Sequence, residues 1–250
     1  RDVKLDDITS CEDNAEILQR LHDQSWDTSL IRLRSTDDDI ADDDYFVVSE
    51  GDDLGWLGYF IGKSKYLEDL RIDAWGEGQN TEAFIKGINR NQSIKYLHIS
   101  TDLRGVSFRN LGPFFRNNNR LVQLRLDFEV GLECAQSIAF ALGEGQCQSL
   151  KYITIERCNL SDEGFARIAT TLRIQPQLER LRLECNNIGL GGCTALGETL
   201  QGWGTSNLTI LDLDKNPIDD QGLQELVAGI TNAKLEELWL SDTLITGAGL

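Results

Sequence analysis

Hydrophobic residues recur along this chain as a fixed triplet, with leucine or isoleucine at the first, fourth and sixth positions of a repeating unit. Successive units start 27 to 30 residues apart, with a mean of 28. A repeat of this regularity indicates a stack of similar structural units, each too small to bury a core alone. The seven units begin at these residues: Leu67, Ile94, Leu121, Leu150, Leu178, Leu208 and Leu235.

Each unit is predicted to form one short strand followed by one helix. Leu181 and Leu183, at the fourth and sixth positions, point to the same side of a strand because side chains alternate between its two faces. After the strand the hydrophobic spacing becomes helical, as in Phe165, Ile168 and Leu172. Stacked units therefore predict a parallel sheet on one side of the molecule and a layer of helices on the other.

A polar position follows the strand in three units, where Cys158, Asn186 or Asn216 stands two residues before a leucine or isoleucine. A short polar side chain there is expected to hydrogen-bond the backbone of the loop that leaves the strand. The first three units lack this residue type, so we expect their loops to close differently. They carry these residues instead: Trp75, Asp102 and Glu129.

The complete pattern resembles leucine-rich repeat proteins, and a 28-residue unit with a full helix resembles their ribonuclease-inhibitor-like subfamily. The resemblance covers residues 54–250 and implies an α/β solenoid, or horseshoe, with a parallel sheet on its concave face and helices on its convex face. We divide the chain into an acidic amino-terminal cap region, 1–53, and a domain of about seven repeats, 54–250, the last one truncated. Since no polar capping unit follows the last repeat, we expect further chain or a partner to cover that end.

The first 53 residues carry 17 acidic and five basic side chains, a net charge of −12. An amphipathic helix is predicted over residues 13–21, and a degenerate first strand over 30–33. Segment 37–44 contains six aspartates in eight residues and is interpreted as a solvated loop. Docking of a basic partner is the alternative for this segment.

The aromatic segment 54–61 precedes the first complete strand and is predicted to be the amino-terminal cap helix, with Trp56 and Phe60 over the end of the core. It leads into Gly-Lys-Ser at 62–64, which also ends the phosphate-binding loop of many nucleotide-binding proteins. That motif requires a glycine where Leu57 stands, and a helix where a strand is predicted here. Nucleotide binding is therefore rejected.

The net charge of −17 and the pI near 4.5 argue against nucleic acid and anionic membranes as partners. No apolar run approaches the roughly 18 residues of a membrane-spanning helix. No secretory signal is visible, and the six cysteines are interpreted as buried free thiols, with Cys193 in the core. We therefore expect an intracellular, soluble protein.

The chain offers little material for catalysis or for a metal site. No Cys-x-x-Cys pair is present, and the two histidines, His22 and His98, cannot complete a zinc site at the usual spacings. His22 lies in the cap region without a nucleophile motif, whereas His98 falls on the predicted sheet as a contact residue. We expect no enzymatic activity, no cofactor and no metal.

The third, fifth and seventh positions of each repeat are predicted to share the concave face, where aromatic and arginine side chains are typical of protein interfaces. The alternative interpretation is a face of salt bridges that keeps the sheet soluble. The candidate partner-binding residues are Tyr96, His98, Arg125, Asp127, Phe128, Tyr152, Glu156, Arg180, Arg182, Glu184, Asp212, Asp214 and Trp239.

These patterns together predict a non-enzymatic protein–protein interaction module that binds a partner, with a basic surface as one option, on its concave face. Members of the resembled subfamily include enzyme inhibitors, GTPase activators and the sensor arms of immune receptors. Three alternatives therefore stay open: an inhibitor of a basic enzyme, a GTPase-activating regulator, and a structural subunit of a larger complex. For the GTPase regulator, Asn159, Asn186 and Asn187 lie near the loops that would act.

Overall fold

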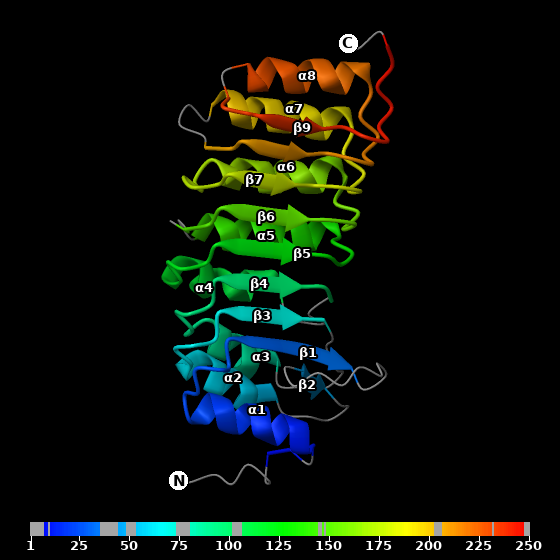
Figure 1. Cartoon of the computed structure of the whole chain (residues 1–250). Helices are drawn as coiled ribbons and strands as arrows, with labels where there is room; N and C mark the ends of the chain where they lie inside the picture. Colours follow the sequence, from blue (N-terminus) through cyan, green and yellow to red (C-terminus); the bar gives the residue numbers. More distant parts are fainter. Residues whose placement is uncertain are drawn as a thin grey trace.

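A computed structural model of the chain shows a long stack of strands with helices behind it (Figure 1). The structure describes residues 8–9, 11–35, 45–48, 54–73, 81–101, 107–144, 147, 149–202, 207–231 and 233–247. The acidic segment 37–44, Trp75 and Asp102 lie outside these residues, so the predictions made for them are not addressed.

Nine described strands form one parallel sheet in the order β2-β1-β3-β4-β5-β6-β7-β8-β9. From β3 onward the repeats are paired in register, so Leu97 lies opposite Leu124 and Leu124 lies opposite Ile153. The strands are β1 (Leu30–Ser35), β2 (Tyr45–Val48), β3 (Asp69–Ile72), β4 (Tyr96–Ile99), β5 (Gln123–Leu126), β6 (Tyr152–Ile155), β7 (Arg180–Arg182), β8 (Ile210–Asp212) and β9 (Glu237–Trp239).

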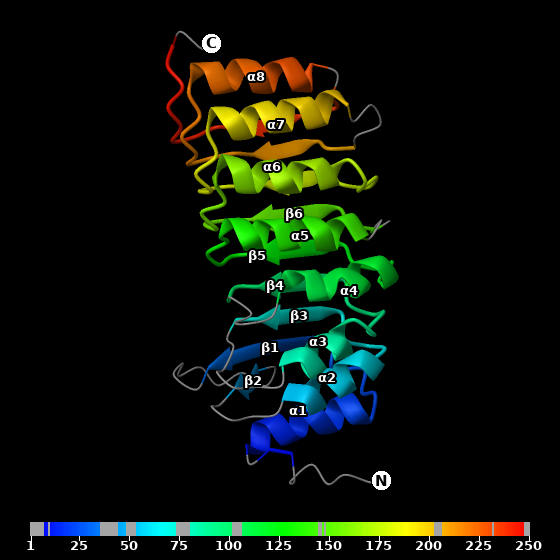
Figure 2. The ribbon, with the colours of Figure 1, turned by 180° about the vertical axis from the view of Figure 1, so that it is seen from behind.

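One side of the sheet is covered by the helix layer, which Figure 2 shows from behind. Hydrophobic side chains from both layers meet in one continuous core, which confirms the predicted α/β solenoid. The helices are α1 (Glu12–His22), α2 (Leu54–Lys63), α3 (Thr81–Ile88), α4 (Gly112–Asn117), α5 (Leu132–Glu144), α6 (Ser161–Leu172), α7 (Leu190–Gln201) and α8 (Asp220–Ile230), with a short 3-10 helix, η2 (Phe108–Leu111). None of the described helices is long and apolar enough to cross a membrane.

The amino-terminal region extends the same sheet and core. The predicted helix and first strand are confirmed as α1 and β1, and Ile17 of α1 is buried in the core. Strand β2, which the sequence did not predict, pairs with the outer edge of β1, and the side chain of Asn14 bonds both backbone groups of Val47 at 2.8 Å. Helix α2 lies between α1 and α3 (Figure 2), so the prediction that segment 54–61 forms the terminal cap helix is wrong, because α1 occupies that position.

Buried asparagines join successive repeats at the loops that leave the strands, as predicted. The side-chain oxygen of Asn216 accepts hydrogen bonds from the backbone N–H groups of Asn186 and Ile188, each at 3.0 Å. The side-chain oxygen of Asn186 accepts one from the N–H of Cys158 at 3.1 Å, and its amide donates to the carbonyl of Ile155 at 2.5 Å. Each asparagine therefore satisfies backbone groups of the preceding repeat as well as its own.

A second row of polar side chains, which the sequence analysis missed, lies at the opposite edge, where each helix returns to the sheet. Asn91 and Asn118 are buried three residues before the first position of their repeats. The amide of Asn91 donates to the carbonyl of Ile61 at 2.7 Å, and its oxygen accepts from the N–H of Ile94 at 2.9 Å. This row could have been found in the sequence from the polar residue that stands three positions before the hydrophobic triplet of each repeat.

Glycines allow two pairs of neighbouring helices to approach closely. A methyl group added at Gly197 of α7 would lie 2.6 Å from the carbonyl oxygen of Glu225 on α8. On α2, a methyl group at Gly58 would lie 2.5 Å from the Cα atom of Phe84 on α3. No L side chain with a Cβ fits at such distances without moving one of the helices.

All six cysteines are free in the structure. Cys147, Cys158 and Cys193 are buried, and burial raises the pKa of each thiol to about 12. The interpretation of buried thiols, including a core position for Cys193, is confirmed for these three. Cys185 is exposed on the loop after β7, so the same interpretation is wrong there.

Candidate protein-binding surface

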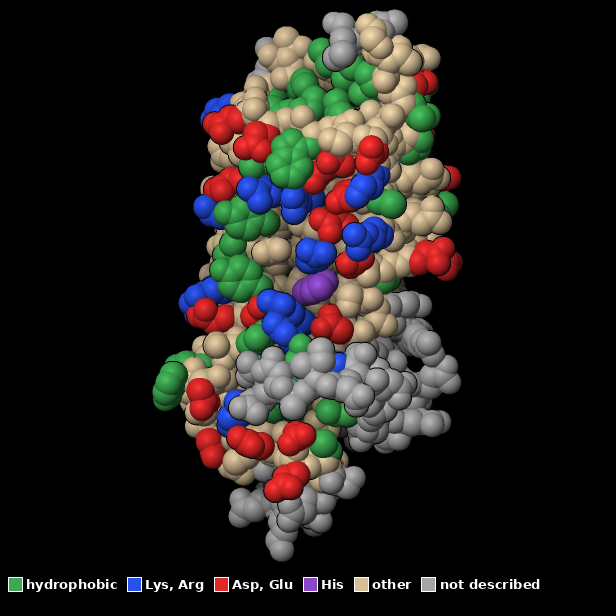
Figure 3. Space-filling model, turned by 45° about the vertical axis from the view of Figure 1, so that its right-hand side comes forward, with side chains coloured by type: hydrophobic (Ala, Val, Ile, Leu, Met, Phe, Trp, Pro, Cys, Tyr) green, Lys and Arg blue, Asp and Glu red, His purple; other side chains and the backbone are tan. Residues whose placement is uncertain are grey.

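The sheet face opposite the helices is open to solvent; we call it the open face (Figure 3). It takes the third, fifth and seventh residues of each repeat, because the fourth and sixth residues point into the core. Since the strands pair in register, residues at one repeat position form a column across the sheet, with adjacent members about 4.8 Å apart.

Two of these columns carry opposite charge. The fifth-position column, which we call the basic column, reads Arg71, His98, Arg125, Thr154, Arg182, Asp212, Trp239. The seventh-position column, which we call the acidic column, reads Asp73, Ser100, Asp127, Glu156, Glu184, Asp214, Ser241. The two columns lie side by side, so attraction between them offsets the repulsion between neighbours within each.

Ion pairs form both between and within these columns in the middle of the sheet. A nitrogen of Arg125 lies 3.0 Å from Glu156 and 3.5 Å from Asp127. Arg182 lies 3.3 Å from Asp212 and 4.0 Å from Glu156. These contacts correspond to the salt-bridge interpretation of the face, and they place Arg125 and Arg182 between acids rather than free in solvent.

The sequence did not predict that two acidic side chains of this face are buried. Asp212 is only 2% exposed and Glu156 only 8% exposed. Burial raises the pKa of Asp212, against the lowering effects of a hydrogen bond from the Asp214 backbone and of Arg182. Glu184 is more accessible, and the Lys215 ammonium, 2.6 Å away, lowers the pKa of that carboxyl. The middle of the face is therefore a nearly saturated charge network.

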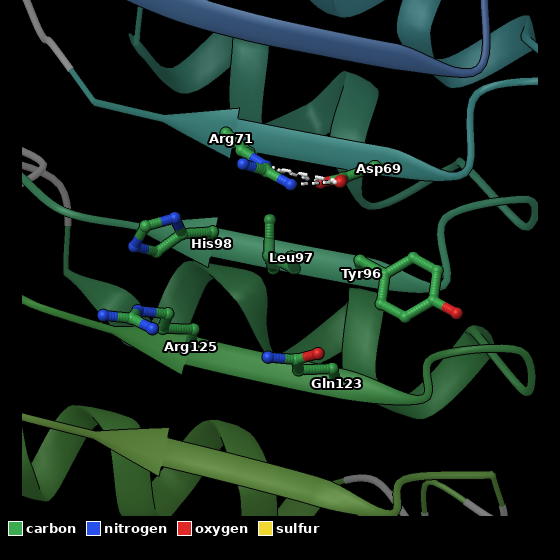
Figure 4. A pocket seen from close by; sticks show the side chains of 7 residues that line it. All are labelled: Asp69, Arg71, Tyr96, Leu97, His98, Gln123 and Arg125. Carbon is green, nitrogen blue, oxygen red and sulfur yellow. Dashed lines mark hydrogen bonds and ion pairs between the residues drawn. The ribbon is translucent and has the colours of Figure 1, made fainter.

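A pocket of about 220 Å³ lies at the other end of the basic column (Figure 4). Arg71, His98 and Arg125 stand next to one another on β3, β4 and β5, with Tyr96 and Gln123 beside them. Arg71 is held by Asp69, 2.9 Å away on the same strand. Burial lowers the pKa of His98, and the two arginines add to this effect against Asp73 and Asp127, so the imidazole is neutral at pH 7.

Exposed aromatic side chains line the same face. Tyr96 is 41% exposed and Trp239 is 37% exposed. The guanidinium of Arg182 lies 5.2 Å from the centre of the Trp239 ring, and that of Arg180 lies 5.9 Å from Tyr152. These cation–π contacts orient the rings while leaving them accessible to solvent.

Phe128 was predicted to be an exposed anchor on this face, and that prediction is wrong. Its ring is 9% exposed and packs in the core together with Val130. At the same repeat position Arg157, Cys185 and Lys215 adopt left-handed backbone conformations, with φ of 55° to 57°, and are exposed. Phe128 does not, which agrees with the expectation that the Leu121 repeat closes its loop differently.

The other twelve candidate residues all lie on the open face. The structure brings Tyr96, His98 and Arg125 into the pocket, and Glu156, Arg182 and Asp212 into the charge network. Asp214 accepts a hydrogen bond from the Ser241 backbone at 2.6 Å. Whether these residues bind a partner stays a prediction.

A groove of about 650 Å³ at the loops after the strands was missed; it includes Arg157, Asn159, Cys185 and Asn187. Asn186, named with these loops for a GTPase regulator, is instead buried in the asparagine row. Within the described part of the chain, no group of three or more His, Cys, Asp and Glu side chains could hold a metal ion.

Comparison with known proteins identifies the repeats. A family model described as Leucine Rich repeat matches residues 176–197 and 206–227. Mouse (Mus musculus) ribonuclease inhibitor is 32% identical over 106 residues, covering 41% of this chain and 23% of that protein. This chain thus spans about a quarter of the length of its curated relative.

Solved structures that match this chain include a chain of the Rad7 and Elc1 complex in yeast, at 16% identity and a TM-score of 0.27, covering 78% of this chain and 68% of that one. An internalin (inlF) from Listeria monocytogenes str. 4b F2365 is 13% identical with a TM-score of 0.24, covering 98% and 93%. At these TM-scores neither structure informs the function. The family model and the mouse relative, together with the fold, support leucine-rich repeats of the ribonuclease-inhibitor-like type in this chain.

Proposed function

We propose that this protein is a non-enzymatic interaction module that binds a partner protein on the open face. Its leucine-rich repeats and its ribonuclease-inhibitor relative support a protein-interaction role. The choice of face rests on its aromatic and arginine side chains, which are enriched at interface hot spots. Tyr96 and Trp239 are exposed, Tyr152 is half-buried, and Tyr152 and Trp239 lie beside Arg180 and Arg182.

The central charge network positions these contacts. Arg125 and Arg182 neutralise acids that are almost fully buried, so they are poorly placed to give up those pairs to a partner. Arg180 has no ion pair among the described residues and stacks beside Tyr152 instead. The accessible recognition elements are therefore the aromatic rings and Arg180, with the network as their rigid base.

The test uses a face variant that leaves the network intact: Tyr96→Ala, Arg180→Ala and Trp239→Ala. A matched variant removes an aromatic ring, an aliphatic side chain and an arginine from the helix side: Phe140→Ala, Val227→Ala and Arg167→Ala. All three of those side chains are exposed. We expect quantitative affinity capture to lose the partner with the face variant alone, and a purified pair to show at least a tenfold weaker affinity.

Equal capture by wild type and the face variant, or loss only with the helix variant, would move the binding site away from the open face. Circular dichroism melts of both variants separate a binding defect from unfolding. Both should melt within a few degrees of wild type, because every substituted side chain is at least partly exposed.

An inhibitor of a basic enzyme is a more specific form of this proposal. The match to mouse ribonuclease inhibitor and the net charge of −17 favour it, because long-range attraction steers a cationic partner toward an acidic protein. Association rates with the captured partner should fall by at least tenfold between 50 mM and 500 mM salt. Rates that stay constant over this range would exclude electrostatic steering and with it this form of the proposal.

A further inference from the structure

A second surface feature lies away from the open face, at the edge where the helices return to the strands. The loops that precede β3, β4 and β5 (Figure 1) line a groove of about 490 Å³, which we call the cationic groove. Its charged side chains are Lys63, Lys65, Arg90 and Arg120, and the rest of its lining is uncharged. Four cations without an acid are unexpected on a protein whose net charge is −17.

Within the described part of the chain, none of these four cations forms an ion pair, and Lys63 donates a hydrogen bond only to the hydroxyl of Tyr59. In contrast, neighbouring Lys95 is paired with Glu68 at 2.6 Å. The positive charge of the groove is therefore uncompensated, whereas that of Lys95 beside it is neutralised by Glu68.

The repeat explains how cations distant in sequence converge. Lys63 and Arg90 both lie four residues before the first hydrophobic position of their repeats, so stacking places them side by side. The floor beneath them is fixed by buried serines. Ser93 donates to the carbonyl oxygens of Ser64 and Leu67 at 3.0 Å and 2.7 Å, and Ser64 accepts from the N–H of Leu67 at 3.1 Å.

We propose that the cationic groove binds a small soluble ligand that carries several phosphate groups. Guanidinium and ammonium groups are the side chains that best match phosphate oxygens, arginine in bidentate geometry. Screening by salt favours a small ligand, because charges act over only about 8 Å, the Debye length at physiological salt. A compact anion inside the groove experiences the four cations, whereas a nucleic acid or membrane surface would also contact the acidic remainder of the molecule.

This site is independent of the open face and can be tested alone with inorganic tripolyphosphate as the probe. The test variant is Arg90→Gln with Arg120→Gln; both side chains are exposed and form no hydrogen bond or ion pair with another described residue, so the fold should be retained. The control, Arg167→Gln with Lys234→Gln, makes the same change in net charge at two exposed sites outside the groove. Isothermal titration calorimetry at 50 mM and 200 mM salt measures the affinity.

We expect one tripolyphosphate to bind each wild-type chain, an at least tenfold loss in the groove variant and less than a twofold change in the control. Affinity should also fall between the two salt concentrations, and inorganic phosphate should bind at least tenfold more weakly than tripolyphosphate. Absence of binding at 1 mM tripolyphosphate, or equal loss in both variants, would overturn the proposal. Binding to phosphatidylserine vesicles without binding of tripolyphosphate would overturn it in favour of a membrane-facing patch.

Discussion

The backbone N–H of Asn186 donates to the side-chain oxygen of Asn216 at 3.0 Å, so one repeat completes the hydrogen bonding of the one before it. Three further bonds from the Asn216 amide reach the carbonyl oxygens of Leu183, Leu213 and Asp214, at 2.9 Å to 3.1 Å. The loops after β7 and β8 are thereby fastened together by one side chain that is 1% exposed.

Replacing this residue, Asn216→Ala, should lower the free energy of unfolding by about 2–5 kcal/mol, because buried backbone groups of two repeats lose their partners. Urea denaturation measures the change. Gln177→Ala, an exposed amide in the turn before β7, is the control and should stay within about 0.5 kcal/mol. An Asn216 variant as stable as this control would show that water replaces the side chain without loss.

Phe128→Ala should destabilise the protein by about 3–5 kcal/mol, since it leaves a cavity in the core. Trp239→Ala removes a larger side chain but should change the free energy of unfolding by less than about 1 kcal/mol, because the ring is exposed and its contacts are with the surface side chains of Arg182 and Glu237. Thermal or urea denaturation of both variants checks the order. The reverse order would place Phe128 on the surface and Trp239 in the core.

Gly197→Ala should destabilise by about 1–3 kcal/mol, because its methyl group would press into the backbone of α8. A matched glycine is available in α5, where a methyl group at Gly143 would meet the nearest side-chain atom at an ordinary 3.8 Å. Gly143→Ala should therefore be neutral or stabilising by about 0.5–1 kcal/mol, as expected for alanine within a helix. Similar effects of both substitutions would mean that α7 and α8 can separate freely.

His98 should titrate below the ordinary histidine range in the folded protein, since burial and two flanking arginines disfavour its charged form. The unfolded chain therefore binds this proton more readily, and the contribution of His98 to folding stability decreases as the pH falls through the ordinary histidine range. His22→Gln leaves His98 as the sole histidine, so its ring protons can be followed by NMR. A midpoint at or above 6.5 would contradict the burial of the ring.

Much of the fold was predictable because it depends on periodic side chains. Alternation along a strand and a constant 28-residue spacing define the sheet, its parallel direction and the asparagines that close its loops. Strand β2 was missed because it follows the acidic segment and lies outside the repeat pattern. Its pairing depends on contacts such as the one between Asn14 and Val47, which are distant in sequence.

The surface was predictable only in its broad arrangement. The position of Phe128 depends on a loop dihedral angle rather than on its place in the repeat. The repeat pattern therefore placed it on the open face, although it lies in the core. The burial of Asp212 depends on how side chains of the neighbouring strands fill the space around it, which one sequence position does not encode. Likewise, the cations of the groove are separated by up to 57 positions, from Lys63 to Arg120, and meet only after the repeats have stacked.

The alternation along β3 to β9 separates core positions from surface positions within single strands. Leu181 maintains the core, while its neighbour Arg180, which forms no ion pair among the described residues, can change without altering the packing beneath it. A protein built this way can acquire a new partner by substituting the surface residues of one strand at a time, and adjacent strands lie about 4.8 Å apart across the sheet. Glu156 and Asp212 are the exceptions, since their burial ties any change there to the neighbouring arginines.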